Sequence, residues 1–272
     1  MQDSPHFPRK NLRGVSLEGD FWATDQDGVR VDPSKAVFPI LKMSKTGKYS
    51  LVGTGFFVGP EGIFATASHV MDEFVADDGS ASGMPLIIQM IEGDSYVKRP
   101  ITSVHKHPRA DICIGRVTSM TSLTRGKLEN PVAKLSSKVP DVGEIVVTYA
   151  YPRSVFQPGE VREACYLWGE FFKGEVQEHF LQGRDSVMLP GPCVQTSIFI
   201  HGGASGGPVF NSQGLVVGVN STGYEDEGLS FITPLYLLKD LKVDGILTSI
   251  DAKEKFTTVA ELIKTGMISF DI

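Results

Sequence analysis

The sequence predicts an all-β protein in which short strands form barrels or a sandwich. Runs rich in β-branched and aromatic residues follow one another from residue 36 to residue 233, and helical periodicity is almost absent there. Turn signals such as Asp-Val-Gly-Glu and Asn-Ser-Gln-Gly separate the runs. The 29 glycines and 16 prolines among 272 residues agree with a fold of many turns. Many short strands without helices between them favour an all-β class.

The expected strands are apolar runs that end at turn residues. In chain order they span residues 36–42, 50–59, 62–70, 85–91, 101–107, 112–118, 144–150, 163–172, 193–200, 208–211, 215–221 and 229–233. The aromatic-rich segment 153–190 is either a set of barrel strands or an exposed docking hairpin, and strands are the favoured interpretation.

The two ends of the chain differ from the strand-rich middle. Residues 1–35 are polar and aperiodic and are expected to form an N-terminal extension. Thr233 is followed by a proline that suits the first turn of a helix, and Thr258 with Glu261 has the spacing of a capping box. Residues 236–272 are therefore expected to form a C-terminal helical tail packed on the strands.

The composition argues against several classes of partner. With 26 basic and 32 acidic residues the net charge is -6, so the chain as a whole repels a phosphate backbone, and no nucleic acid is expected. Three widely spaced cysteines argue against a disulfide framework and for a reducing compartment. No apolar run has the length of a signal-peptide core or a membrane span. The sequence therefore predicts a cytoplasmic protein with no membrane partner, unless the chain is a processed product.

One loop combines small residues with a single reactive side chain. The stretch from Gly203 to Pro208 reads Gly-Ala-Ser-Gly-Gly-Pro, and its glycines let another molecule approach the backbone beside Ser205. A serine nucleophile needs a base and a group that orients the base. The candidates are His69, at the end of a predicted strand, and Asp111, directly before an apolar run. Taken singly, Ser205 is equally an ordinary loop serine, whereas such a histidine is more often a capping or buried one and such an aspartate is more often a turn residue or strand cap.

His105 and His107 are spaced so that both rings share one face of a strand. No second cluster completes a tetrahedral set of ligands, so the pair is interpreted as solvent-facing. The sequence predicts neither a metal nor a cofactor.

The chain order His69, Asp111, Ser205 resembles that of the trypsin/chymotrypsin-like serine peptidases and differs from the subtilisin-like and α/β-hydrolase orders. Within that superfamily the motifs are most similar to the HtrA (Deg) branch. The matching segments are Gly53-Thr54-Gly55-Phe56, Thr66 to Val70, Asp111 to Ile114, Val142 to Val146 with Pro152, and Gln195-Thr196 through Pro208. The resemblance extends over about residues 50–234.

This resemblance implies a chymotrypsin-like fold, a double six-stranded β-barrel with the active-site cleft between the two barrels. The first barrel is expected to span residues 36–140 and the second residues 141–235, with short C-terminal helices in the tail.

The resemblance also implies a serine endopeptidase with a catalytic triad. Ser205 would attack the scissile carbonyl, His69 would take its proton, and Asp111 would orient the imidazole. The N–H groups of Gly203 and Ser205 would form the oxyanion hole. Phe199 stands where trypsin has an acidic residue, so an apolar or small P1 residue is expected rather than lysine or arginine. The expected substrate-binding residues are Phe199, Ile200, His201, Gly202, Ser221, Thr222 and Gly223.

The chain departs from the family pattern beside the nucleophile. Trypsin-like zymogens carry there an aspartate that pairs with a new N-terminal ammonium, and HtrA proteins an asparagine, whereas this chain has Ala204. No Arg-Ile-Val-Gly-Gly-like activation site occurs either, so no trypsin-type zymogen activation is expected. Gly202 and Gly203 make the loop flexible, which leaves a partner or effector as a candidate switch. Too few residues follow Pro234 for a PDZ domain, so selection of substrates is expected to depend on other segments or another chain.

Two other functions are compatible with these residues. A non-catalytic protein-binding scaffold would keep the fold without turnover, and an esterase would use the same triad on a different bond. For the peptidase, the expected partners are a protein or peptide substrate and an activating protein.

Overall fold

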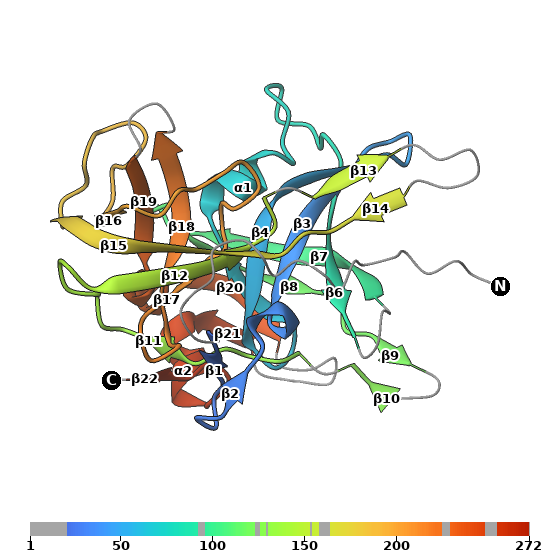
Figure 1. Cartoon of the computed structure of the whole chain (residues 1–272). Helices are drawn as coiled ribbons and strands as arrows, with labels where there is room; N and C mark the ends of the chain where they lie inside the picture. The colour runs from blue at the N-terminus through green and yellow to red at the C-terminus, as the bar shows by residue number, and fades with distance from the viewer. Residues whose placement is uncertain are drawn as a thin grey trace.

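A computed structural model of the chain describes residues 21–91, 96–122, 126–128, 130–152, 154–157, 164–224, 229–247 and 255–271. Its strands form two closed barrels that stand side by side, with short elements from both ends of the described chain packed on them (Figure 1). This confirms the predicted all-β fold of two six-stranded barrels.

The first barrel is an antiparallel sheet closed by pairing between its first strand and β6. Alternate residues of its strands point inward, and the buried ring of Phe38 packs on those of Phe57 and Phe64. The strand order is β3-β4-β5-β8-β7-β6, with β3 at Val37–Met43, β4 at Tyr49–Gly59, β5 at Ile63–Thr66, β6 at Met84–Met90, β7 at Tyr96–Lys106 and β8 at Cys113–Val117. A short helix, α1 at Ser68–Asp72, follows β5.

The second barrel closes because β17 pairs with both β12 and β18. Its order is β17-β12-β15-β16-β19-β18, with β12 at Ile145–Ala150, β15 at Glu170–Phe180, β16 at Cys193–Thr196, β17 at Pro208–Phe210, β18 at Val216–Tyr224 and β19 at Leu229–Pro234. The short strands β11 (Leu135–Ser136) and β22 (Phe270–Asp271) extend this sheet beyond β18 through parallel pairing.

The segment before the first barrel packs against the second one. β1 (Ala23–Thr24) pairs with β2 (Arg30–Val31), and a 3-10 helix, η1, follows at Pro33–Lys35. The N–H of Thr24 donates to the Gly214 carbonyl at 2.9 Å. Phe21 packs its ring on Phe171 and Phe210. The described part of the expected extension is therefore held on the barrel surface.

The segment 153–190 divides into two parts. β13 (Val155–Gln157) and β14 (Ala164–Tyr166) form a hairpin outside the barrels, whereas β15 is a barrel strand (Figure 1). The interpretation of this segment as barrel strands alone is thus wrong for the hairpin. A further small hairpin, β9 (Thr121–Ser122) with β10 (Gly126–Lys127), also stands apart.

The tail contains the two helical segments expected from the sequence. Leu235–Asp240 forms η3, a 3-10 helix, and α2 spans Val259–Lys264 behind the Thr258 capping box. A hairpin of β20 (Lys242–Leu247) and β21 (Lys255–Thr258) lies between them. Within the described ranges, no helix has the length and apolar character needed to cross a membrane.

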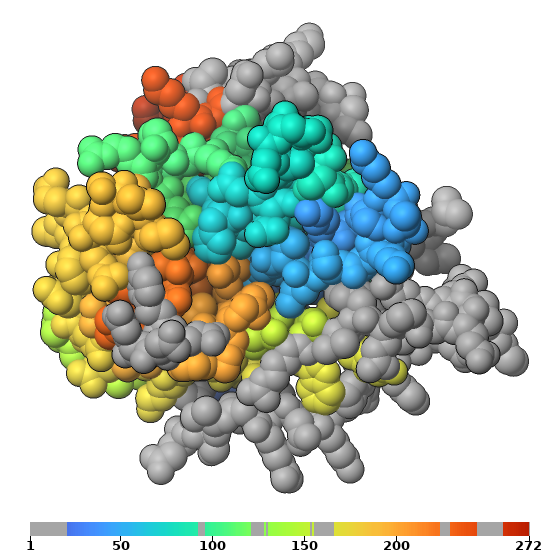
Figure 2. Space-filling view, turned by 90° about the horizontal axis from the view of Figure 1, so that it is seen from above, coloured from blue at the N-terminus to red at the C-terminus, as the bar shows by residue number. Residues whose placement is uncertain are grey.

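The two barrels meet along one face of the molecule. Figure 2 shows residues of the first barrel, in blue and cyan, directly against orange residues of the second barrel. At this junction α1 follows β5, and the loop before β17 approaches β4, where the Thr54 N–H donates to the Ser205 carbonyl at 2.8 Å. His69 lies on α1, Ser205 lies on the loop before β17, and Asp111 directly precedes the segment that leads into β8.

Candidate active site

Strand pairing in the first barrel brings His69 and Asp111 together. β5 and β8 are antiparallel partners, with Thr66 opposite Cys113. His69 comes three residues after Thr66 on α1, and Asp111 comes two residues before Cys113, so both leave the paired strands at the same end. The Ser68 hydroxyl also joins the two segments by donating a hydrogen bond to the Ile112 carbonyl at 2.8 Å.

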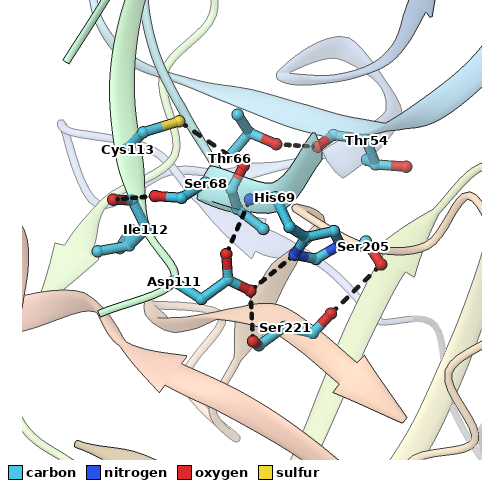
Figure 3. Close-up of polar contacts among 10 residues, drawn as sticks. Thr54, Thr66, Ser68, His69, Asp111, Ile112, Cys113, Ser205 and Ser221 are labelled. Atoms are coloured by element: carbon cyan, nitrogen blue, oxygen red, sulfur yellow. Dashed lines mark hydrogen bonds and ion pairs between the residues drawn. The ribbon is translucent and has the colours of Figure 1, made fainter. Parts of the chain in front are cut away.

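The Asp111 carboxylate is bound to His69 by both of its oxygens. The backbone N–H of His69 donates to Oδ1 at 3.0 Å, and Nδ1 of its ring lies 2.8 Å from Oδ2. The Ser221 hydroxyl of β18 also donates to Oδ2 (Figure 3). The preceding turn is fixed by the His107 ring, whose Nδ1 accepts from the N–H groups of Arg109 and Ala110. The carboxylate therefore has a single well-defined orientation.

Charges around the pair favour its ionised forms. Burial lowers the pKa of His69, but the hydrogen bond and charge of Asp111, with the charges of Asp72 and Glu73, outweigh burial and raise it above its ordinary value. For Asp111, burial raises the pKa, yet the His69 and Ser221 contacts lower it below its ordinary value. Asp111 is thus a carboxylate near neutral pH, and His69 is a strengthened base.

Ser205 lies on the other side of the imidazole from Asp111. In Figure 3 the His69 ring is between the carboxylate and Ser205, and the serine hydroxyl points toward Ser221. Ser205 Oγ donates to the Ser221 carbonyl at 3.3 Å. One strand, β18, therefore contacts both Asp111 and Ser205. The structure brings together the three residues that the sequence singled out.

The glycines around Ser205 are required by the fit of the turn. Gly206 has a φ of 84°, and a Cβ there would overlap Thr66 Oγ1 and the Thr54 carbonyl oxygen. Gly203 has a φ of 89°, and the N–H of Ala204 donates to the His201 carbonyl at 3.0 Å. A hydrogen-bonded turn with positive φ at its third residue is of type II, which favours glycine there.

The residues expected to bind substrate do not share one environment. Phe199 is 44% exposed and its ring packs edge-on to that of His201, whereas the Ile200 side chain is buried in the core of the second barrel. Gly202 borders open space, and Thr222 and Gly223 are half-buried on β18. The hydroxyl of Ser221 is bound to Asp111 rather than directed at a pocket.

Sequence reasoning missed two buried polar residues beside the turn, Thr54 and Asn220, and the role of Ser221. Thr54 was visible as part of the Gly-Thr-Gly-Phe motif, and Asn220 directly precedes Ser221. No signal in the sequence identified the partners of these side chains.

The family model described as a trypsin-like peptidase domain matches residues 53–219. The chain belongs to the trypsin-like peptidase family. The match contains His69, Asp111 and Ser205 and includes strands of both barrels, so the peptidase domain accounts for most of the described fold.

Relatives of this peptidase domain include proteins named as serine proteases. A probable periplasmic serine endoprotease, DegP-like, of Pseudomonas savastanoi pv. phaseolicola is 29% identical over 195 residues, which cover 70% of this chain and 34% of the relative. Serine protease PepD of Mycobacterium tuberculosis is 25% identical over 218 residues, covering 80% of this chain and 41% of the relative. The chain thus spans about a third of the length of the first of these relatives.

Solved structures share the fold of the peptidase domain. The crystal structure of Deg5 superposes with a TM-score of 0.54 at 21% identity and covers 74% of this chain and 84% of Deg5. The HtrA-type protease AlgW with tripeptide gives a TM-score of 0.51 at 18% identity, covering 75% of this chain and 57% of AlgW. The predicted HtrA-type, chymotrypsin-like fold is confirmed.

The predicted cytoplasmic location is wrong, because the DegP-like relatives are named as periplasmic proteins and point to an extracytoplasmic location. The prediction rested on the three widely spaced cysteines and on the lack of an apolar signal-peptide core near the N-terminus. Cys113 and Cys193 are both buried, and burial raises the pKa of both thiols, that of Cys193 to about 11. Burial and a raised pKa disfavour the reactive thiolate in either kind of compartment, so these two cysteines do not discriminate between compartments.

Proposed function

We propose that the peptidase domain is a serine endopeptidase that cleaves protein or peptide substrates through an acyl-enzyme. The observation that carries this proposal is the hydrogen bond between His69 Nδ1 and the ionised Asp111, with the imidazole directed at Ser205. A base that is oriented in this way and supported by a negative charge is what a serine nucleophile requires.

In the proposed reaction, rotation about the Cα–Cβ bond of Ser205 moves its hydroxyl from the Ser221 carbonyl to His69. Nε2 of His69 takes the proton as Oγ attacks the scissile carbonyl carbon, and it then gives that proton to the leaving amine. A water molecule attacks the resulting ester with the help of the same base, which releases the acid and restores Ser205. Asp111 remains ionised and stabilises the imidazolium formed in each half of the reaction.

The N–H groups of Gly203 and Ser205 are proposed as the oxyanion hole. Neither group donates to an acceptor in the ranges that the structure describes, so both are available to a developing oxyanion. Such donors stabilise the tetrahedral intermediate more than the ground-state carbonyl and thereby lower the barrier.

An apolar or small P1 side chain suits the surroundings of the nucleophile. Phe199 and His201 present rings rather than a carboxylate on the segment before the turn. The edge of β18 at Thr222 and Gly223 is proposed to pair with the substrate backbone, because an extended peptide adds readily to a strand edge. Ile200 contributes only its backbone, since its side chain is in the core.

Activation by cleavage of the N-terminus is not part of the proposal. Ala204 is fully buried in the apolar core of the second barrel, where its methyl group offers nothing to an N-terminal ammonium. The names of the relatives favour action outside the cytoplasm.

One observation favours a second possibility, a resting site that an activating partner converts. The Ser205 hydroxyl is bonded to the Ser221 carbonyl rather than to His69. A partner that binds beside the turn would then shift Ser205 to its reactive rotamer. If Ser205 never took up that rotamer, the protein would be a non-catalytic scaffold.

The test is labelling of the purified protein with a fluorophosphonate, with mass spectrometry to locate the adduct. Ser205→Ala is expected to abolish the label and to lower peptide hydrolysis by about 10⁴- to 10⁶-fold, whereas the exposed Ser212→Ala should label like wild type. Wild-type protein that labels but leaves casein and peptide libraries uncut would favour the esterase alternative. An unlabelled Ser205, even with candidate partners added, would contradict the proposal.

A further inference from the structure

The nucleophile turn is held in place although it lacks the acidic side chain that trypsin-like zymogens use for this purpose. Ala204 supplies only a methyl group. The backbone carbonyls of Gly203, Ala204 and Ser205 each accept a hydrogen bond instead. The donors come from both barrels, so the turn is fixed by its neighbours and not by its own side chains.

Thr54 of β4 holds two of these carbonyls from the first barrel. Its hydroxyl donates to the Gly203 carbonyl at 2.8 Å, and its backbone N–H donates to the Ser205 carbonyl at 2.8 Å. The same hydroxyl accepts from the N–H of Tyr151 at 3.2 Å. The Thr54 side chain is fully buried, so water does not compete for these bonds.

Asn220 of β18 holds the middle carbonyl from the second barrel. Its Nδ2 donates to the Ala204 carbonyl at 3.2 Å and to Thr148 Oγ1 at 2.7 Å. Asn220 is fully buried, and its Oδ1 has no hydrogen-bond partner in the described part of the chain. A buried unpaired amide oxygen lowers stability, so an apolar residue would suit the core better. The Asn220 amide therefore contributes to the position of the Ala204 carbonyl rather than to the stability of the fold.

These bonds determine the direction of the N–H groups in the turn. In a trans peptide the C=O and the following N–H point in opposite directions. The Ala204 carbonyl points into the second barrel toward Asn220, so the Ser205 N–H must point out of that barrel. The Gly203 carbonyl points toward Thr54, which leaves the Ala204 N–H to close the turn on His201.

We infer that Thr54 and Asn220 form a carbonyl clamp, a pair of positioning residues that aims the Ser205 N–H at the substrate oxyanion and joins the turn to the barrel that carries His69. The inference rests on the proposed function, because it assigns the orientation of the proposed oxyanion hole. In this chain the clamp takes the place of a charged residue at position 204.

The test uses Asn220→Leu and Thr54→Val, which remove the side-chain donors and nearly keep the shapes, while the backbone N–H of residue 54 stays on the Ser205 carbonyl. In Asn220→Leu the Ala204 carbonyl keeps its bond from the Gly207 N–H, and Thr148 keeps its bond to the Pro208 carbonyl. The fold is therefore expected to persist, as judged by circular dichroism and thermal unfolding. Thr54→Ser keeps the hydroxyl and is expected to keep wild-type activity, which makes it the matched control for Thr54→Val.

The deciding readout compares a p-nitrophenyl ester of a small apolar acid with its thiono analogue. Sulfur accepts hydrogen bonds poorly, so an oxyanion hole favours the oxygen ester. Each clamp variant is expected to lower kcat for the ester by about 10²-fold with little change in KM, and to lower the preference for the oxygen ester by a similar factor. Equal losses on both esters, with the preference unchanged, would overturn the clamp and leave Thr54 and Asn220 as structural residues.

Crystal structures of wild type and Asn220→Leu separate failure of the clamp from failure of the proposed function. In Asn220→Leu only the Gly207 N–H remains on the Ala204 carbonyl, and this bond lies within the turn and does not attach it to the barrel. A tilted 204–205 peptide is therefore expected in the variant, whether or not the protein is active. An unrotated peptide would overturn the clamp even in an active enzyme. Wild-type protein that neither labels at Ser205 nor cleaves the ester would overturn the proposed function alone, and the peptide rotation would still decide the clamp.

Discussion

At the scale of single residues, the proton affinity of His69 depends on carboxylates that do not take part in the proposed reaction. Asp72 is 67% exposed on α1, and its charge is one of those that raise the pKa of His69. It also pairs with Lys106. Because α1 carries both His69 and Asp72, the helix that positions the proposed base also raises its pKa.

A pH profile of Asp72→Asn tests this effect. Only neutral His69 acts as a base, so kcat/KM falls as the pH drops through its pKa, and a raised pKa places that fall at higher pH. Neutralising Asp72 removes an attractive charge and leaves Lys106 uncompensated, so the midpoint is expected to move to lower pH with the plateau unchanged. Salt should reduce the difference. Asp141→Asn, an exposed acid on the second barrel, is the control, and an equal shift in it would contradict the explanation.

The residues of the candidate site were predictable where the type of side chain and its order in the chain are enough to suggest a role. Ser205, His69 and Asp111 have side chains suited to nucleophile, base and orienting acid, and their chain order matches one family. Ser221 was predicted from the family motif to bind substrate, and the bond that its hydroxyl donates to Asp111 was not predicted. A hydroxyl can donate a hydrogen bond to, or accept one from, any polar group that the fold brings near it. The partner of the Ser221 hydroxyl, Asp111, is 110 residues away along the chain. Such a pairing has no local signature.

At the scale of elements, α2 depends on a capping box that was readable from the sequence. Thr258 Oγ1 accepts from the Glu261 N–H at 3.3 Å, and the Glu261 carboxylate accepts from the Thr258 N–H at 3.2 Å. Thr258→Ala is expected to destabilise the protein by about 1 kcal/mol and to lower the melting temperature by about 2–4 °C in calorimetry. Thr258→Ser keeps the hydroxyl and should melt like wild type. Activity should not change, since α2 lies far from α1 (Figure 1), and a loss of activity without a lower melting temperature would contradict this assignment.

Strands were predictable as apolar runs, but their division into sheets was not. The run 163–172 was expected to be one strand, whereas β14 ends at Tyr166 and β15 begins at Glu170. Gly169 lies in the break, where a Cβ would overlap the Tyr149 hydroxyl. The break is therefore fixed by a contact with β12, and neighbouring residues in the sequence carry no sign of it. An off-barrel hairpin and a barrel strand have the same aromatic, β-branched composition.

At the scale of the whole molecule, each barrel buries one thiol, Cys113 or Cys193, and so protects it from oxidants in the surroundings. Cys113 is fully buried in the first barrel and Cys193 is 2% exposed in the second. Only the thiolate reacts with alkylating or oxidising agents, and burial raises the pKa of both thiols. The thiols of Cys113 and Cys193 in the native protein should therefore stay reduced in an oxidising compartment, as expected for a relative of periplasmic enzymes.

Iodoacetamide treatment at pH 8 with peptide mapping tests this protection. In native protein the peptides with Cys113 and Cys193 are expected to stay unmodified for hours, because reaction requires the barrels to open, and both should be modified within minutes in denaturant. Incubation with oxidised glutathione should give the same pattern and leave the melting temperature unchanged. Rapid modification of either cysteine in the native state would mean that its barrel opens readily. Exposed thiols do not persist outside a reducing environment. Burial would then fail to explain how these two cysteines stay unpaired in an extracytoplasmic location.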